Sequence, residues 1–333
     1  MTVTPVTDIE RSGWSNQTQA KSQVSSNRNG PSHSKGYDMP VIQERISISV
    51  ETIMLATDFS QASESAAVFA KALAKRFCSI VEIAHIFNSS TIDSYEAAIV
   101  GLPIEQRRQN SQEQLESLQN EFRSYGIASR SVSSDGHRPG HDLLKLAKKD
   151  KIELIVAGTR SKRGMERLLL GSTAEQILRG STCPVLTVGP KVQMPTETVL
   201  SFKSILFATN FSVEAAKAAT FALSFAEDSG SHIYYCHVIA PYPEAQGEAP
   251  IVDGMFEAAL KMMIPDISYE WCSPEAVIEH GEAAKGILTI AEKVHADLIV
   301  VGPRKASFLL SHIGHGVTPD LLAEARCPVL TVC

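Results

Sequence analysis

The residues best placed to do chemistry are glycines and hydroxyls near the end of a short apolar segment. Residues 154–158 read LIVAG, Ser161 follows closely, and Gly171 and Ser172 open a segment with helical apolar spacing. A glycine at the end of a parallel strand lets backbone N–H groups approach an anion, and a helix N-terminus presents free N–H donors. Ser172 adds a hydroxyl donor. The pattern is typical of a phosphate site, and turn and cap chemistry is the alternative interpretation.

An acidic residue and several cations could complete such a site. Asp58 follows the apolar run 53–56 after Thr57, which places it where open α/β sheets bind ligands, at the carboxyl end of a strand. A turn or N-cap role is the other interpretation of Asp58. The cations around the glycine-rich stretch could neutralise phosphate charge or form a solvated basic loop. They are Arg160, Lys162, Arg163 and Arg167, and Arg160 is the best candidate.

Metal binding has little support in the sequence. His137 and His141 are spaced like helical zinc ligands, and His312 and His315 are also close, but neither pair has a third ligand nearby. We therefore predict no metal site.

Catalysis has equally little support. The serines Ser60, Ser172 and Ser212 fit helix capping better than a nucleophilic role. His85 and His237 fall inside predicted strands at matching positions, where packed structural histidines are expected. Packing also explains the two cysteines that precede prolines, Cys183 and Cys327. We predict no catalytic residue.

Alternating strands and helices must position these residues. Apolar runs predict strands at 53–56, 80–87, 127–133, 154–158 and 184–188, and again at 204–208, 232–239, 267–272, 298–302 and 328–332. Helical spacing predicts helices after Ser60, at about 103–125, 143–147 and 172–180, and again at 215–226, 251–263 and 284–294. This alternation implies parallel β-α-β units with right-handed crossovers.

The two halves of the chain are copies of one unit, which we call the first and second repeat. Residues 152–188 and 296–332 align without a gap, share LIV and the glycine that ends the strand, and both end in CPVLTV. Upstream, TIMLATDFS at 52–60 matches SILFATNFS at 204–212. A repeat of this length indicates a duplicated domain. The predicted organisation is a disordered polar tail at 1–47, a first domain at 48–189, a linker at 190–202 and a second domain at 203–333.

These motifs resemble the universal stress protein family over about 48–189 and 203–333. Family members that bind ATP carry G-x2-G-x9-G-[S/T] between a LIVxG strand and CPVLxV. Gly158, Ser161, Gly171 and Ser172 occupy these positions, with serine in place of the second glycine. The resemblance implies two tandem flavodoxin-like (adenine nucleotide alpha hydrolase-like) α/β domains. Each would be a five-stranded parallel sheet with helices on both faces.

The resemblance also assigns roles to individual residues. Adenine and ribose would lie against Ala56, Thr57, Asp58 and Ile86. The phosphates would be held by Gly158, Thr159, Arg160, Ser161, Gly171, Ser172 and Thr173. The implied cofactor is ATP or another adenine nucleotide, with or without Mg²⁺.

The second repeat departs further from the family pattern. Gly302 remains, but Lys305 stands at the second glycine, His315 and Gly316 replace Gly-Ser, Asn210 replaces the aspartate and Pro303 removes a backbone donor. We predict a degenerate copy that does not bind ATP in the family manner. Because family members usually dimerise through their last strand, 185–188 would pair with 329–332 as an intramolecular pseudo-dimer. A further homodimer of whole chains stays open.

Composition, net charge and cysteine content indicate the cellular compartment and the classes of partner. The chain has 333 residues, 44% of them hydrophobic, and a net charge of −6, which argues against a nucleic-acid binder. Its six cysteines form no C-x-x-C pair, as expected in a reducing compartment. It has no signal-peptide pattern and no apolar run near the ~18 residues of a membrane span. We predict a cytoplasmic protein without nucleic-acid or membrane partners.

The sequence is compatible with three functions. The first is a universal stress protein whose first domain binds an adenine nucleotide and signals to an unknown protein partner in a stress response. The second is a nucleotide-independent interaction module, which Ser161 and the losses in the second repeat favour. The third is a slow ATPase or autophosphorylating protein.

Overall fold

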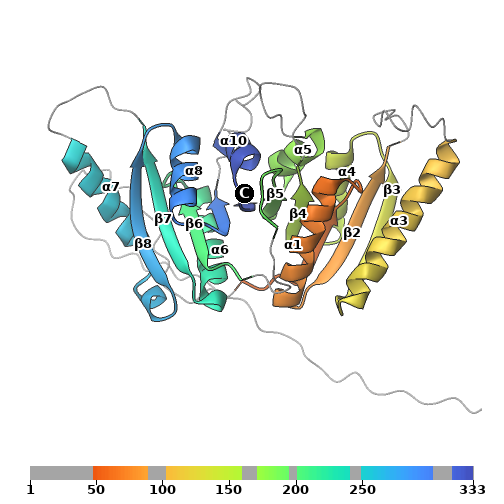
Figure 1. Ribbon diagram of the computed structural model, residues 1–333, viewed down its shortest axis with the longest axis horizontal. Coiled ribbons are helices and arrows are strands. Elements are labelled where there is room, and N and C mark those ends of the chain that lie inside the picture. Colours follow the sequence, from red (N-terminus) through yellow and green to blue (C-terminus); the bar gives the residue numbers. More distant parts are fainter. Residues whose placement is uncertain are drawn as a thin grey trace, which may run out of the picture. The chain divides into compact units, whose positions relative to one another are not determined.

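The computed structural model describes residues 48–88, 103–159, 171–194, 201–240, 249–302 and 317–332. Within these ranges the first repeat alternates strands and helices (Figure 1). Its elements are β1 Thr52–Ala56, α1 Gln61–Phe77, β2 Ile80–Phe87, α3 Ile104–Ser124, β3 Ser129–Asp135, α4 Pro139–Lys149, β4 Leu154–Gly158, α5 Ser172–Gly180 and β5 Val185–Val188.

The second repeat follows the same order. Its elements are β6 Ser204–Ala208, α6 Val213–Ser229, β7 His232–Ile239, α7 Ala249–Met263, the 3₁₀ helix η1 Asp266–Glu270, β8 Ser273–His280, α8 Ala283–Lys293, β9 Leu298–Val301, α10 Val317–Glu324 and β10 Val329–Thr331. In the ranges that the structure describes, no helix combines the length and apolar character needed to cross a bilayer.

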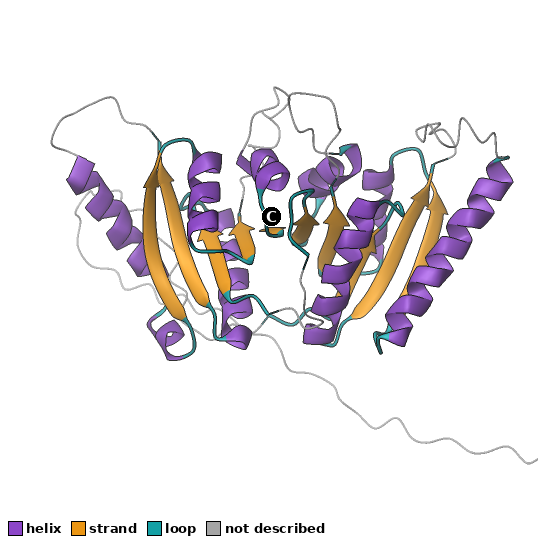
Figure 2. Cartoon of the chain, in the orientation of Figure 1, coloured by secondary structure: helices purple, strands orange, loops and turns teal. Residues whose placement is uncertain are grey.

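The strands form a ten-stranded sheet in the order β3-β2-β1-β4-β5-β10-β9-β6-β7-β8. The five strands of each repeat are parallel to one another, and β5 and β10 are antiparallel. Figure 2 shows helices packed on the sheet in both halves. The predicted fold class, two tandem five-stranded parallel units, is therefore confirmed.

The strand sequences explain why helices cover both faces. In β1, Ile53 and Leu55 join one apolar cluster with side chains of α1 and α3, whereas Met54 and Ala56 join a second cluster with side chains of α4 and α5. Alternate side chains of a strand point to opposite faces, so a continuous apolar run is buried only when both faces are covered.

One predicted strand is wrong. Residues 267–272 are not a strand, because η1 occupies Asp266–Glu270 and the edge strand β8 begins at Ser273. The backbone N–H and the hydroxyl of Ser268 both donate to the carbonyl of Pro265, at 2.9 and 2.6 Å, which stabilises the turn. The proline at position 274 hid β8 in the sequence, although proline is tolerated in an edge strand.

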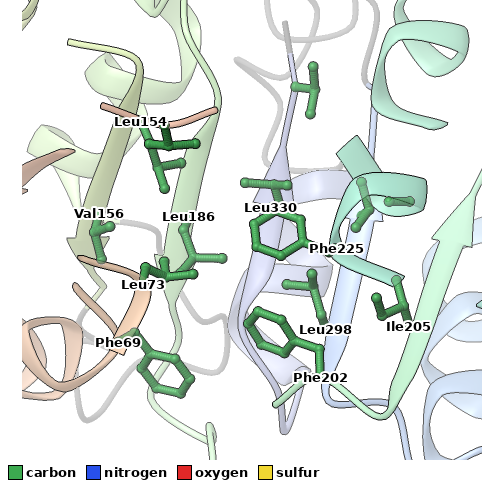
Figure 3. Close-up of a cluster of buried hydrophobic side chains, with 14 of the residues drawn as sticks. Phe69, Leu73, Leu154, Val156, Leu186, Phe202, Ile205, Phe225, Leu298 and Leu330 are labelled. Atoms are coloured by element: carbon green, nitrogen blue, oxygen red, sulfur yellow. The ribbon is translucent and has the colours of Figure 1, made fainter. Parts of the chain in front are cut away.

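The repeats meet at β5 and β10, where Leu186 lies opposite Leu330. Figure 3 shows apolar side chains on both sides of this junction. Beside it, the Arg76 guanidinium of α1 donates to the Phe225 carbonyl of α6 at 2.8 Å and lies 5.1 Å from the Phe225 ring centroid. The contact therefore combines apolar packing with a cation held between the repeats.

Candidate functional site

The predicted site residues of the first repeat lie at one edge of the sheet, which we call the carboxyl edge. Strand β1 ends at Ala56 between its neighbours β2 and β4, which end at Phe87 and Gly158. Helix α5 begins above the end of β4 in the view of Figure 1. From β1 the chain continues to β2 and β3 on one side, and from β4 it continues to β5 on the other. Open α/β sheets form a ligand crevice where the strand order reverses in this way.

Thr57 is fixed inside the loop that leads from β1 to α1. Its backbone N–H donates to the Ala84 carbonyl at 3.0 Å, and its hydroxyl donates to Ser63 Oγ at 3.1 Å. The same hydroxyl accepts the N–H of Phe59, which adopts a φ of 59°. Thr57 is only 8% exposed, so its hydrogen bonds hold the loop in place. The sequence did not single out Ser63, whose side chain is buried in the first turn of α1.

Asp58, in contrast, is exposed at the carboxyl edge. Its Oδ1 accepts the N–H of Ser60 at 3.1 Å and also contacts the Ser60 hydroxyl. In the second repeat, Asn210 Oδ1 accepts the N–H of Ser212 at 3.0 Å in the same way. Because an asparagine makes the same turn, the negative charge of Asp58 is not required for the loop conformation.

Ile86 and His85 line the end of β2. Ile86 is 7% exposed and belongs to the apolar cluster on the α4 and α5 side of the sheet. His85 Nδ1 lies 2.9 Å from the Thr57 carbonyl, and burial lowers the pKa of this histidine. His237 Nδ1 lies 2.8 Å from the Thr209 carbonyl in the second repeat. The prediction that these histidines are packed structural residues is confirmed.

Gly158 has a packing role that the sequence did not reveal. A Cβ atom at this position would lie 2.0 Å from the Ala62 carbonyl oxygen in α1. A Cβ on Gly302 would lie 2.2 Å from the Glu214 carbonyl oxygen in α6. Both repeats therefore need a glycine here for close contact between helix and strand. Thr159, which follows Gly158, is buried and donates its N–H to the Val188 carbonyl at 2.9 Å.

Gly171 has no such packing role. It is the N-cap of α5 with φ −61° and ψ 140°, values that any residue adopts, and no described atom lies within 4 Å of a Cβ built on it. No side chain caps this helix end, and Ser172 is its first residue, so the prediction that Ser172 is a cap is wrong. Ser60 and Ser212 do cap α1 and α6, as predicted. The first turn of α5, including Thr173, thus offers backbone N–H donors beside an open position.

The sequence analysis did not predict the contact between α4 and α5. A Cβ on Gly140 would lie 2.5 Å from Gln176 Cβ and 2.8 Å from the Thr173 carbonyl oxygen. Glycine therefore lets the first turn of α4 touch the first turn of α5. The Pro139-Gly140 pair after β3 could have indicated from the sequence that α4 begins here, because proline favours the first helical position.

Several predicted residues lie outside the described part of the chain. In the first repeat these are Arg160, Ser161, Lys162, Arg163 and Arg167. In the second repeat they are Pro303, Lys305, His312, His315 and Gly316. The roles assigned to them stay predictions.

The described ranges contain neither a cluster of metal ligands nor a cysteine, among Cys183 and Cys327, with a lowered thiol pKa. No group of three or more His, Cys, Asp or Glu side chains that could hold a metal ion occurs there. Burial raises the pKa of the Cys183 thiol and raises that of Cys327 to about 12, which keeps both protonated near neutral pH. These cysteines pack as expected of inert thiols.

The geometry defines a duplicated open α/β protein whose first repeat has an exposed carboxylate and an uncapped helix N-terminus at the carboxyl edge. The chain belongs to the universal stress protein family as a tandem member, because the sequence pattern of that family matches residues 49–189 and 201–332.

Individual relatives match one repeat. A universal stress protein of Methanocaldococcus jannaschii is 33% identical over 144 residues, covering 41% of this chain and 80% of that protein. Universal stress protein YxiE of Bacillus subtilis is 30% identical over 144 residues, covering 41% of this chain and 97% of that protein. A crystal structure of a universal stress protein from Archaeoglobus fulgidus has the same fold over both repeats, with a TM-score of 0.62, 20% identity, and coverage of 84% of this chain and 97% of that one.

Proposed function

We propose that the first repeat binds an adenine nucleotide, ATP or a related molecule, at the carboxyl edge of its sheet. Adenine and ribose would lie against Ala56, Asp58 and Ile86, and the phosphates against the first turn of α5 at Gly171. The bound nucleotide would act as a signal or a structural ligand in a stress response and would be read by a protein partner.

The comparison between the two repeats carries this proposal. Positions that both repeats keep have structural explanations, such as the strand-end glycines Gly158 and Gly302 with their close helix contacts. Asp58 and Gly171 are kept only in the first repeat, and the fold requires neither, since Asn210 replaces the carboxylate and no described atom blocks a side chain at position 171. Residues that the fold does not require, gathered at the ligand-binding edge of an open sheet, support a role in binding.

The chemistry of these residues suits a nucleotide. An exposed carboxylate can accept hydrogen bonds from ribose hydroxyls, and the 7% of Ile86 that stays exposed at the end of β2 would give a base an apolar contact. The N–H groups at the start of α5 suit a phosphate, with the positive end of the helix dipole behind them.

The second repeat would serve as a built-in partner in an intramolecular pseudo-dimer. The antiparallel pairing of β5 with β10 supports this role, because it joins the two sheets through matching strands of the duplicated unit. A two-fold related pairing of this kind resembles an isologous dimer contact within one chain.

The test is to denature purified full-length protein, identify the released nucleotide and count it per chain. We expect about one adenine nucleotide per chain, lost in Gly171→Asp because a carboxylate would face the phosphates. Aspartate is a favoured N-cap residue, so this variant should fold at least as well as wild type. The matched control is Gly254→Asp in α7, another glycine with no described atom within 4 Å of its Cβ position.

Other results would identify a different function. Two nucleotides per chain would contradict a degenerate second repeat. No bound nucleotide, together with no thermal shift on adding ATP and Mg²⁺, would overturn the proposal and favour a nucleotide-independent interaction module. Release of ADP and phosphate that disappears in Gly171→Asp would favour a slow ATPase.

A further inference from the structure

We infer that Arg138 and His141, at the start of α4, form a basic rim that binds the phosphate groups of the ligand together with the first turn of α5. This inference rests on the proposed nucleotide site and extends it to two residues outside the glycine-rich stretch. It makes ligand charge a determinant of affinity in the first repeat.

Geometry places the rim beside the proposed phosphate position. Arg138 and His141 flank Gly140, whose Cβ position lies 2.8 Å from the Thr173 carbonyl oxygen in the first turn of α5. The same region reaches the expected adenine wall, because a Cβ on Gly136 would lie 2.8 Å from Ile86 Cγ2 and 2.4 Å from Asp142 Oδ2. A ligand that spans Ile86 and the start of α5 would therefore pass the start of α4.

Both rim residues are accessible. Arg138 and His141 are exposed, and within the described ranges no acidic side chain pairs with the Arg138 guanidinium. The nearby carboxylate of Asp142 lies 3.1 Å from Lys145 Nζ and 3.7 Å from His141 Nδ1. The charge of Asp142 is thus largely matched by Lys145, and Arg138 keeps its positive charge for a ligand.

The placement of the Arg138 cation is unfavourable for the helix itself. Arg138 is the N-cap of α4 and makes no side-chain cap hydrogen bond, and His141 follows in the first turn. The N-terminus of a helix carries the positive end of its dipole, so cations are disfavoured there and anions are favoured. A cation at a helix N-terminus beside a ligand crevice indicates that a bound anion compensates this unfavourable placement.

The second repeat shows the arrangement without this feature. The N-cap of α8 is Glu282, whose carboxylate lies 2.7 Å from Lys285 Nζ. The same helix start therefore accommodates an acidic, internally paired cap. The basic start occurs in the repeat that keeps Gly171 and Ser172, and the neutralised start occurs in the repeat that lacks them.

The test is a calorimetric titration of full-length protein with ATP, with adenosine and with inorganic triphosphate. The variants are Arg138→Gln, Arg138→Glu and His141→Gln. We expect each Gln variant to weaken ATP and triphosphate binding about 5-fold, the scale of one partly exposed charge-assisted contact, and to leave adenosine binding unchanged. The control, Lys148→Gln, removes the same charge from the other end of α4 and should change nothing.

Folding effects are separable from binding effects. Arg138→Glu introduces the residue type found at Glu282, so its unfolding temperature should equal or exceed that of wild type while triphosphate binding falls further. Unchanged ATP and triphosphate affinity in Arg138→Gln, or an equal loss for adenosine, would overturn the inference and leave the nucleotide proposal standing. Triphosphate binding that depends on Arg138 without any adenosine binding would uphold the rim and overturn the adenine site. Absence of triphosphate binding to wild type would overturn the rim.

Discussion

Replacing Gly158 with alanine tests whether this glycine serves packing or a ligand. The new Cβ would lie 2.0 Å from the Ala62 carbonyl oxygen, and the neighbouring heavy atoms, Ala62 C and Ser63 N, would lie at 2.3 and 2.8 Å. All three are backbone atoms, so no flexible side chain can move away. The end of β4 and the start of α1 would have to separate by about 1 Å merely to reach a 3 Å contact.

The expected cost is at the upper end of the range for overpacked sites. We expect the free energy of unfolding to fall by about 3 kcal/mol. For a protein of this size the unfolding temperature would fall by roughly 6–12 °C. Gly302→Ala should behave alike, because its Cβ would lie 2.2 Å from the Glu214 carbonyl oxygen.

Gly171→Ala is the contrasting variant. Its backbone angles suit alanine and its Cβ position is open among described atoms, so the free energy of unfolding should change by less than about 1 kcal/mol, the scale of losing a favourable N-cap. The assay is thermal and denaturant unfolding of the three variants without added nucleotide. An unfolding temperature of Gly158→Ala equal to that of wild type would refute the packing argument. A loss in Gly171→Ala as large as that in Gly302→Ala would refute the claim that position 171 is structurally free.

Three further predictions concern the carboxyl edge and the junction between the repeats. Asp58→Asn should change the free energy of unfolding by less than about 1 kcal/mol, since Asn210 makes the same turn, while nucleotide retained per chain falls on denaturing release. Arg76→Ala should lower it by about 2 kcal/mol in denaturant titrations, because the hydrogen bond to the Phe225 carbonyl and the ring contact are both lost; an unchanged midpoint would contradict this. Burial lowers the pKa of His85 below its ordinary 6.5, so the stability contributed by the neutral ring is complete above pH 6.5 and is lost as pH falls through the folded-state value. His85→Gln should therefore lose less unfolding temperature than wild type between about pH 7.5 and about pH 5, and an identical pH profile would contradict it.

The duplication and the alternation of strands and helices along the chain could be predicted, because both depend on patterns that are local in the sequence. Short continuous apolar runs such as 53–56 and 154–158 predict strands that are covered on both faces. The helix at 172–180 could be predicted with its boundaries, because its apolar residues recur at helical spacing. The failure at 267–272 has a local cause as well. A turn made by Ser268 and Pro265 competed with the strand, and proline in β8 concealed an edge position that only the sheet order reveals.

The candidate site shows a different limit. The residues that differ between the repeats, such as Asp58 against Asn210 and Gly171 against His315, can be found without a structure, because the two copies of the duplicated unit can be compared directly. The reason why both repeats keep certain residues is visible only in the packed fold. Gly158 and Gly302 look like ligand-binding glycines in a motif, yet each faces a helix carbonyl across space, a contact that spacing along the chain cannot encode. The meeting of α4 with α5 at Gly140, which brings Arg138 to the same edge, likewise exists only after both helices have packed on one face of the sheet.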